Sequence, residues 1–230
     1  MTGASRNGAD LVMVQAPRSA AAEAYRTLST NIQFSSLDRD VRTLLVTSVG
    51  PDEGKSIVLA NLAITMAEGG RRIVMVDCDL RRPSLHRIFE LPDQPGLTTM
   101  MLDESLSPPL QPTAVDNVSL VSSGPLPPNP AELISSERFG RVLAAIGAGA
   151  DLILLDAPPV SAVTDATILA TRVDGVLLVV DSGRTRREPG RRAADQLQRV
   201  GARVLGAVLT NVKAEKIQAD YLGKSKRSPS

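Results

Sequence analysis

The sequence predicts an α/β fold in which a doubly wound, mostly parallel sheet is flanked by helices. From residue 43 onward, short aliphatic runs alternate with amphipathic stretches, which is the pattern of strands joined by crossover helices. Several runs, such as Ile73–Val76 and Val176–Val180, are aliphatic throughout, as expected for strands covered on both faces. Hydrophobic residues make up 43% of the chain but aromatic residues only 2%, so the predicted core is aliphatic.

Each element follows from a run of this kind. A first helix over Ala20–Phe34 is supported by Tyr25, Leu28 and Ile32, which recur at helical spacing. The strands expected after it are Thr43–Thr47, Arg72–Asp77, Val118–Val121, Asp151–Asp156, Gly175–Asp181 and Arg203–Leu209. The helices expected between them are Lys55–Glu68, Pro83–Phe89, Pro130–Ile146, Asp165–Arg172 and Arg186–Val200. The stretch from Leu91 to Pro130 is rich in Pro and Ser, and apart from its one strand we expect it to run as loop over the surface.

The length of 230 residues suits one domain with short appendages. We expect a flexible segment at residues 1–16, the domain at residues 17–212 and a basic, flexible tail at residues 213–230. No run approaches the roughly 18 to 20 apolar residues that span a bilayer, and the N-terminus lacks the pattern of a secretory signal. Cys78 is the single cysteine, which excludes an intramolecular disulfide and a multi-cysteine metal site. These features favour a cytoplasmic protein.

The net charge is only +1, but it is unevenly distributed. From Arg184 to Arg227 there are 12 Lys and Arg residues against 4 Asp and Glu residues. This excess fits a solvated basic face, or a contact with an acidic partner, an anionic lipid or a polymer. No aromatic residues are interleaved with these charges to stack on bases, so nucleic acid is not the expected partner.

The strongest functional signal is the segment Ser48–Ser56, placed between a predicted strand and a predicted helix. Such a turn presents backbone N–H groups and a helix N-terminus to phosphate oxygens, which makes it a phosphate-binding loop (Walker A). Gly54 allows close approach of the backbone, Lys55 reaches the terminal phosphates, and Ser56 supplies a hydroxyl to Mg²⁺. The residues expected to bind the nucleotide here are Gly50, Pro51, Asp52, Glu53, Gly54, Lys55, Ser56 and Ile57.

The loop departs from the common pattern at two positions. Val49 stands where the standard spacing has glycine, and Gly50 falls one residue late. Asp52 places a carboxylate in the loop, so we expect its side chain to point away from the phosphates.

Two further aliphatic strands end in carboxylates. Asp77 and Asp79 follow Ile73–Val76, so one of them is a candidate to position or deprotonate the attacking group and the other to hold Mg²⁺ through water. A strand-ending Asp that only caps the next turn is the alternative. Asp156 ends the strand Asp151–Asp156 in the Walker B arrangement and is the expected direct or water-mediated Mg²⁺ ligand. The sequence therefore predicts a site for Mg-ATP at the carboxyl edge of the sheet.

These three boxes together resemble the bacterial tyrosine kinases, in which they are called Walker A, Walker A′ and Walker B. The similarity extends to Glu23–Asn31, to Arg81–His86 and to Pro128–Leu133, and covers about Arg18 to Lys213. The residues to which the resemblance gives ATP, Mg²⁺ and catalytic roles are Lys55, Ser56, Asp77, Asp79 and Asp156, with Lys55, Asp77 and Asp79 as the catalytic group and Ser56, Asp79 and Asp156 as the metal group.

The resemblance also implies partners. Members of the family phosphorylate tyrosines on a neighbouring copy, form rings and couple to a membrane activator of polysaccharide chain-length control. The segment 17–36 is then the helix for subunit contact, with Glu23 and Arg26 as its contact residues, although Ser29 stands where the family has a second arginine. A partner of this kind would recruit the cytoplasmic domain to the inner face of the plasma membrane.

The family's C-terminal tyrosine cluster is missing, because Tyr25 and Tyr221 are the only tyrosines. Tyr221 is the phosphoacceptor candidate, and Tyr25 is expected to pack against the domain. Asn211, after the last strand, is a candidate to hydrogen-bond the adenine base. Two alternatives to a kinase remain: an ATPase switch resembling the partition and septum-positioning ATPases, and a nucleotide-binding regulatory subunit of a polysaccharide export complex.

Overall fold

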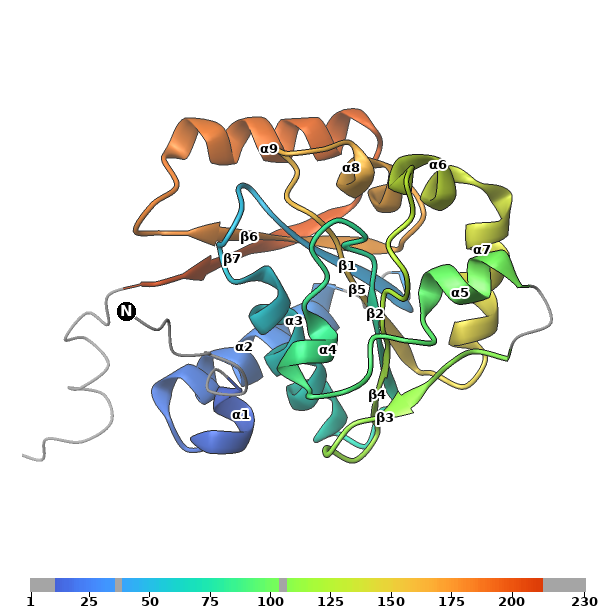
Figure 1. The fold of residues 1–230 in the computed structure, drawn as a ribbon. Helices are drawn as coiled ribbons and strands as arrows, with labels where there is room; N and C mark the ends of the chain where they lie inside the picture. The colour runs from blue at the N-terminus through green and yellow to red at the C-terminus, as the bar shows by residue number, and fades with distance from the viewer. Residues whose placement is uncertain (1–10, 36–38, 104–106, 213–230) are drawn as a thin grey trace, which may run out of the picture.

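The computed structural model describes residues 11–35, 39–103 and 107–212. A seven-stranded sheet in the order β3-β4-β2-β5-β1-β6-β7 forms its centre, with helices on both faces (Figure 1). Neighbouring strands are parallel except for β3 and β4, which are antiparallel. The strands are β1 (Thr43–Ser48), β2 (Ile73–Asp77), β3 (Gln111–Pro112), β4 (Val118–Val121), β5 (Leu152–Asp156), β6 (Gly175–Asp181) and β7 (Val204–Thr210). The predicted doubly wound, mostly parallel sheet is confirmed.

Helices α5 to α9 cover one face of the sheet, and α2, α3 and α4 cover the other (Figure 1). The helices are α1 (Val12–Gln15), α2 (Ala20–Ser35), α3 (Lys55–Ala67), α4 (Leu85–Ile88), α5 (Leu97–Leu102), α6 (Pro130–Ser135), α7 (Glu137–Gly147), α8 (Asp165–Ala170) and α9 (Arg187–Arg199). Residues of each strand alternate between the two cores: in β5, Ile153 and Leu155 face one core, and Leu152 and Leu154 face the other. Burial on both sides explains why the strand sequences are aliphatic throughout.

The order of the central strands positions the functional site. β5 lies between β1 and β2, and Asp77 of β2 is in register with Asp156 of β5. The chain leaves β1 toward β2 on one side, while β6 pairs on the other side of β1. Such a reversal opens a crevice at the carboxyl ends of the strands, where ligands bind in sheets of this type.

Part of the N-terminal segment is structured, against expectation. Residues Val12–Gln15 form α1, and Met13 is buried at 4% exposure against Ala22 and Ile64. The backbone N–H of Met13 also donates to Asn61 Oδ1 at 3.1 Å. The prediction of a flexible segment over 1–16 is therefore wrong for residues 11–16, because the apolar side chain of Met13 packs on α3; residues 1–10 lie outside the described part.

The region from 91 to 130 holds more structure than its Pro and Ser content indicated. It contains α5 and the short strand β3. Leu97, Met100 and Met101 of α5 pack into the core between the sheet and helices α5 to α9. The predicted helix over Pro130–Ile146 is interrupted at Ser136, which has a ψ of 155° and accepts the N–H of Phe139 on its Oγ at 3.3 Å. Ser136 thus begins α7 as its N-cap.

Candidate functional site

The phosphate loop joins β1 to α3, as predicted. Most of α3 is buried, which fixes its first residue, Lys55, at the carboxyl edge of the sheet. Gly54, just before it, has a φ of +84°, a conformation that favours glycine. A cavity of about 340 Å³ opens here. Its lining residues are Pro51, Asp52, Glu53, Gly54, Lys55, Ser56, Ile57, Asp79, Arg82, Ser84, Arg87, Ile88 and Pro159.

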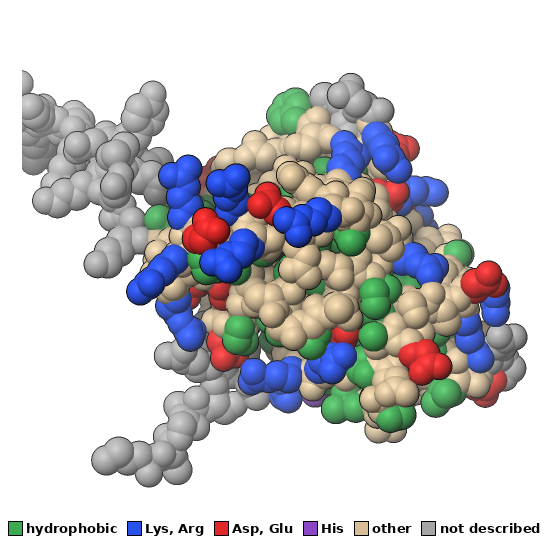
Figure 2. Space-filling view, turned by 90° about the horizontal axis from the view of Figure 1, so that it is seen from above, with side chains coloured by type: hydrophobic (Ala, Val, Ile, Leu, Met, Phe, Trp, Pro, Cys, Tyr) green, Lys and Arg blue, Asp and Glu red, His purple; other side chains and the backbone are tan. Residues whose placement is uncertain are grey.

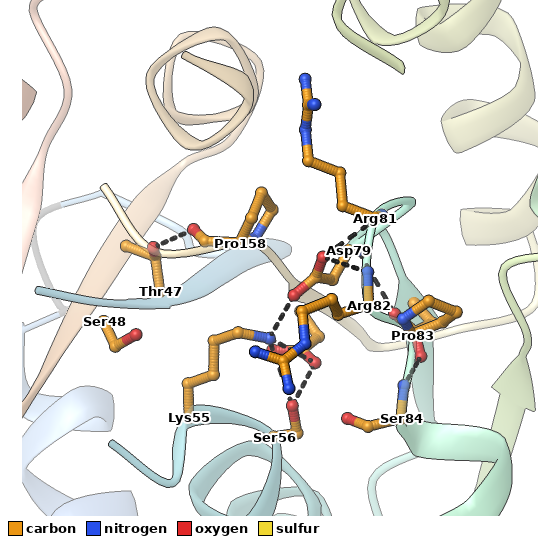
Figure 3. A network of polar contacts seen from close by, with 12 residues as sticks. Thr47, Ser48, Lys55, Ser56, Asp79, Arg81, Arg82, Pro83, Ser84 and Pro158 are labelled. Carbon is orange, nitrogen blue, oxygen red and sulfur yellow. Dashed lines mark hydrogen bonds and ion pairs between the residues drawn. The ribbon is translucent and has the colours of Figure 1, made fainter. Parts of the chain in front are cut away.

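Lys55, which lines this cavity together with Ser56 and Asp79, binds the carboxylates of Asp79 and of the buried Asp156 (Figure 3 shows Lys55, Ser56 and Asp79). Its Nζ lies 2.9 Å from Asp79 Oδ2, 3.0 and 3.1 Å from the two oxygens of Asp156, and 3.2 Å from Ser56 Oγ. Burial lowers the pKa of Lys55, but the charges of Asp156, Asp79 and Asp77 outweigh it and hold the pKa above its ordinary value. Lys55 is therefore a fixed cation at the place where terminal phosphates are expected.

Asp77 is fully buried at the end of β2. Its Oδ2 accepts the N–H of Ser84 at 2.9 Å and of Leu85 at 3.0 Å, and its Oδ1 accepts the N–H of Asp79 at 3.2 Å. Burial raises the pKa of Asp77 above its ordinary value, as does the charge of Asp156, while Lys55 and the N–H groups lower it. Asp77 thus shapes the turn, as the capping alternative expects; it lies beside Lys55 and Asp156 but does not itself line the cavity.

Ser56, Asp79 and Asp156 are brought together around Lys55. Ser56 Oγ donates to Asp156 Oδ2 at 2.5 Å, and burial raises the pKa of Asp156. Within the described ranges there is no group of three or more His, Cys, Asp or Glu arranged to hold a metal ion. Mg²⁺, however, commonly takes only one or two carboxylates and completes its shell with phosphate and water. Two carboxylates and a hydroxyl fit that requirement.

The carboxylate of Glu53 is directed into the protein and holds the loop. It is buried at 5% exposure, its Oε2 accepts the N–H of Val49 at 3.0 Å, and its Oε1 accepts the hydroxyl of Thr185. The hydroxyl of Thr210 donates to the carbonyl of Glu53 at 3.0 Å. The side chain of Glu53 is therefore committed to the loop, which leaves its backbone to contact a nucleotide.

The other predicted loop residues differ in where they lie. Asp52 has a φ of +58° and an exposed side chain whose Oδ1 lies 3.9 Å from Nη1 of Arg82. Pro51 and Ile57 line the cavity, whereas Gly50 is not among the lining residues and its carbonyl accepts the hydroxyl of Ser48 at 2.7 Å.

Asn211 does not line this cavity. It directly follows β7 with a φ of +54°, and its Nδ2 donates to Oδ2 of the buried Asp181 at 2.8 Å. This bond fixes the amide next to the β6 and β7 ends, and its Oδ1 remains a candidate acceptor for a base.

The predicted subunit-contact residues lie on α2. Glu23 is exposed and 3.5 Å from Arg26, whose guanidinium also contacts Glu68 at 3.4 Å and donates to the carbonyl of Pro17 at 3.0 Å. Ser29, where the family has arginine, is buried at 6% exposure. Tyr221 lies outside the described residues.

Sequence reasoning missed several residues of the site. Arg87, Ile88 and Pro159 line the cavity, and their only signal is that they follow a strand-ending Asp box, whereas Arg82 and Ser84, which also line it, belong to the Arg81–His86 stretch of the family resemblance. Arg81 binds Asp165 through Nε at 2.8 Å and Nη2 at 3.0 Å, a partner 84 residues away that no local pattern indicates. The role of Thr185 had no signal in the sequence, because it lies 132 residues from Glu53.

Comparisons with known proteins decide the family. A family model described as "ParA: NUBPL iron-transfer P-loop NTPase" matches residues 41–220. The tyrosine-protein kinase YwqD of Bacillus subtilis (strain 168) is 38% identical over 213 residues, which are 92% of this chain and 90% of that protein. The chain belongs to the bacterial tyrosine kinase family. The resemblance stated from the motifs is confirmed.

Solved structures of this family superpose closely. The chimerical protein CapA2B2 has a TM-score of 0.82 at 33% identity, covering 87% of this chain and 89% of the other. The kinase domain of the Escherichia coli tyrosine kinase ETK has a TM-score of 0.84 at 28% identity, covering 89% of this chain and 81% of the other. The cell division ATPase MinD of Pyrococcus furiosus, at 0.61 and 23% identity, shares the fold alone. Among the described residues, none of the helices of this tyrosine kinase family member is long and apolar enough to cross a membrane.

Proposed function

We propose that the chain is an ATP-dependent protein-tyrosine kinase. The observation that carries this function is the convergence of three strand ends: Lys55 Nζ lies within 3.1 Å of oxygens of both Asp79 and Asp156, and Asp77 is in register with Asp156. Membership in the tyrosine kinase family selects tyrosine as the acceptor. The ATPase switch is less well supported, because Val49 and Gly50 stand where such proteins usually carry an early lysine.

In this mechanism each group has one role. Lys55 neutralises charge on the transferred phosphoryl group, and Asp77 accepts the tyrosine proton. Ser56, Asp79 and Asp156 hold Mg²⁺, which supplies further charge neutralisation on the phosphates when bound. Lys55 must exchange its bonds to Asp79 and Asp156 for phosphate oxygens, because these same carboxylates are needed by the metal.

The remaining loop residues hold the nucleotide. The backbone of Pro51, Asp52, Glu53 and Gly54 and the start of α3 at Ile57 surround the phosphates, whereas Gly50, which does not line the cavity, supports the loop through its bond to Ser48. Asn211 contacts the adenine base through its free amide oxygen. The catalytic domain is residues 17–212, with α1 packed onto it and the tail 213–230 carrying Tyr221.

The proposed partners follow from the family and from surface charge. A homo-oligomer forms through α2, with exposed Glu23 as the main contact, since Arg26 is already bound to Glu68 within the chain. Exposed arginines gather over α9 and the segment before it (Figure 2): Arg184, Arg186, Arg187, Arg191, Arg192 and Arg199. This basic face suits an acidic segment of a membrane activator of polysaccharide chain-length control, which would recruit the cytoplasmic kinase to the inner face of the plasma membrane.

Incubation with labelled Mg-ATP, followed by phosphotyrosine mapping, tests the activity. The design is simple because Tyr25 and Tyr221 are the only tyrosines. Label on Tyr221 that is lost in Lys55→Met and in Tyr221→Phe, and kept in Tyr25→Phe, supports an autokinase. Arg42→Met, an exposed change before β1 at the opposite edge of the sheet, is the matched control and keeps the label. Phosphate release without any labelled tyrosine, also in the presence of an activator, supports the ATPase switch instead.

A further inference from the structure

The aspartate in the phosphate loop has a partner across the mouth of the site. Asp52 Oδ1 lies 3.9 Å from Nη1 of Arg82, and the side chains are 67% and 73% exposed. The distance exceeds that of a hydrogen bond, so the pair is weak and is screened by solvent. Asp52 has a φ of +58° and lines the cavity at the loop. The contact therefore links the phosphate loop to the turn after β2 without fixing either.

Arg82 is directed toward the phosphate cradle, unlike its neighbour. It lines the same cavity of about 340 Å³ as Lys55 and Ser56, and Figure 3 shows its side chain extending on the side of these two residues. The side chain of Arg81 points the other way and is bound by Asp165 through two hydrogen bonds. The backbone N–H of Arg82 donates to Asp79 Oδ1 at 3.0 Å, which anchors its Cα beside a proposed metal ligand. Two adjacent arginines thus differ in how far their guanidinium groups are already engaged.

We propose that Arg82 binds the terminal phosphate of ATP and that Asp52 is its exchangeable counter-ion. The inference rests on the proposed ATP-dependent function. A phosphate group carries more charge than a carboxylate and accepts two parallel guanidinium hydrogen bonds, so it displaces the distant and solvated Asp52. Asp52 opposes nucleotide binding by competing for Arg82 and, more weakly because it is exposed to solvent, by repelling the phosphates directly. The pair accounts for an acidic residue in a loop that binds anions.

Competition binding tests this with nucleotides that differ in the terminal phosphate. A fluorescent N-methylanthraniloyl-ADP is displaced, in Mg²⁺, by ADP or by the non-hydrolysable ATP analogue AMP-PNP. Arg82→Ala is expected to lower the affinity for AMP-PNP about tenfold and the affinity for ADP less than about twofold, because a charge-assisted bond to the third phosphate is lost. Arg82→Lys keeps part of the AMP-PNP affinity. Arg42→Ala, which removes an exposed arginine before β1, is the control and changes neither affinity.

Asp52→Asn is expected to change the affinity for AMP-PNP in the opposite direction. It is expected to strengthen the binding of AMP-PNP about two- to fourfold in the wild-type background and clearly less when combined with Arg82→Ala, since only the direct repulsion of the phosphates is then relieved. Circular dichroism verifies that each variant is folded. An equal loss of affinity for ADP and AMP-PNP in Arg82→Ala, or a gain from Asp52→Asn that is undiminished without Arg82, overturns the inference while leaving the kinase function intact. Failure of the wild-type chain to bind either nucleotide would remove the proposed function itself.

Discussion

The bond between Glu53 and Thr185 allows a quantitative test of how the phosphate loop is held. Thr185→Val removes the hydroxyl but keeps the shape of the side chain. The carboxylate of Glu53 then keeps only its hydrogen bond from the backbone N–H of Val49. Hydrogen bonds to charged groups contribute about 1.5 to 3 kcal/mol, and the half-buried position of Thr185 places the expected loss of stability near the lower end.

Glu53→Ala should cost more, because it removes both bonds and leaves a cavity. The N–H of Val49 keeps a second partner, the carbonyl of Val179 at 3.1 Å, so no buried donor is orphaned. We therefore expect about 2 to 4 kcal/mol in the free energy of unfolding. The same loosening of the loop should weaken ADP binding several-fold in both variants.

Urea denaturation and titration with fluorescent ADP measure the two effects. Thr171→Val is the matched control, because its hydroxyl donates to the carbonyl of Ile168 at 2.8 Å on the surface, and it should cost less than about 0.5 kcal/mol. If Thr185→Val behaves like Thr171→Val in both stability and affinity, the bond does not hold the loop and the reasoning is refuted.

Three further results are expected. Lys55→Met should abolish phosphoryl transfer and also lower the stability of the nucleotide-free protein by about 3 kcal/mol, since Asp79 and Asp156 lose their cation. Unfolding curves without and with Mg²⁺ measure the change in stability, and an unchanged unfolding midpoint contradicts it. The pKa values of Asp77 and Asp156 are raised, so above about pH 4 the folded state binds more protons than the unfolded state, and the stability contributed by these carboxyls should fall as pH rises. Thermal unfolding from pH 5 to 8 tests this direction, and stability should depend less steeply on pH in Asp77→Asn. Arg81→Ala should destabilise the fold by about 1 to 3 kcal/mol because Asp165 is 1% exposed, whereas Arg82→Ala should change stability by less than about 0.5 kcal/mol in the same denaturation experiment.

The main chemistry of the site could be read from the sequence because it depends on strand ends. A run of aliphatic residues that ends in Asp predicts both a buried strand and a carboxylate at its carboxyl edge, and parallel strands bring these ends together. Lys55, Asp79 and Asp156 meet for this reason, although Lys55 and Asp156 are 101 residues apart. The element boundaries were also close, with most strands shifted by about one residue.

What escaped prediction depends on pairs that no local pattern records. The carboxylate of Glu53 could face a ligand or the protein. Its bond to Thr185, which follows β6, decides that it faces the protein. The same is true of Arg81, which binds the distant Asp165, and of Met13, which completes a small apolar contact on α3. Propensity and composition carry no information on such long-range partners.

The insertion of β5 between β1 and β2 has a consequence for how the protein is made. During synthesis the phosphate loop and the Asp77 box are complete well before residue 152, yet their two strands do not pair with each other and must wait for the strand that separates them. Closing this non-local arrangement is a slow step compared with helix formation. A nascent chain that ends before residue 152 therefore lacks the strand that pairs with both β1 and β2, and it also lacks Asp156, so its nucleotide site is incomplete.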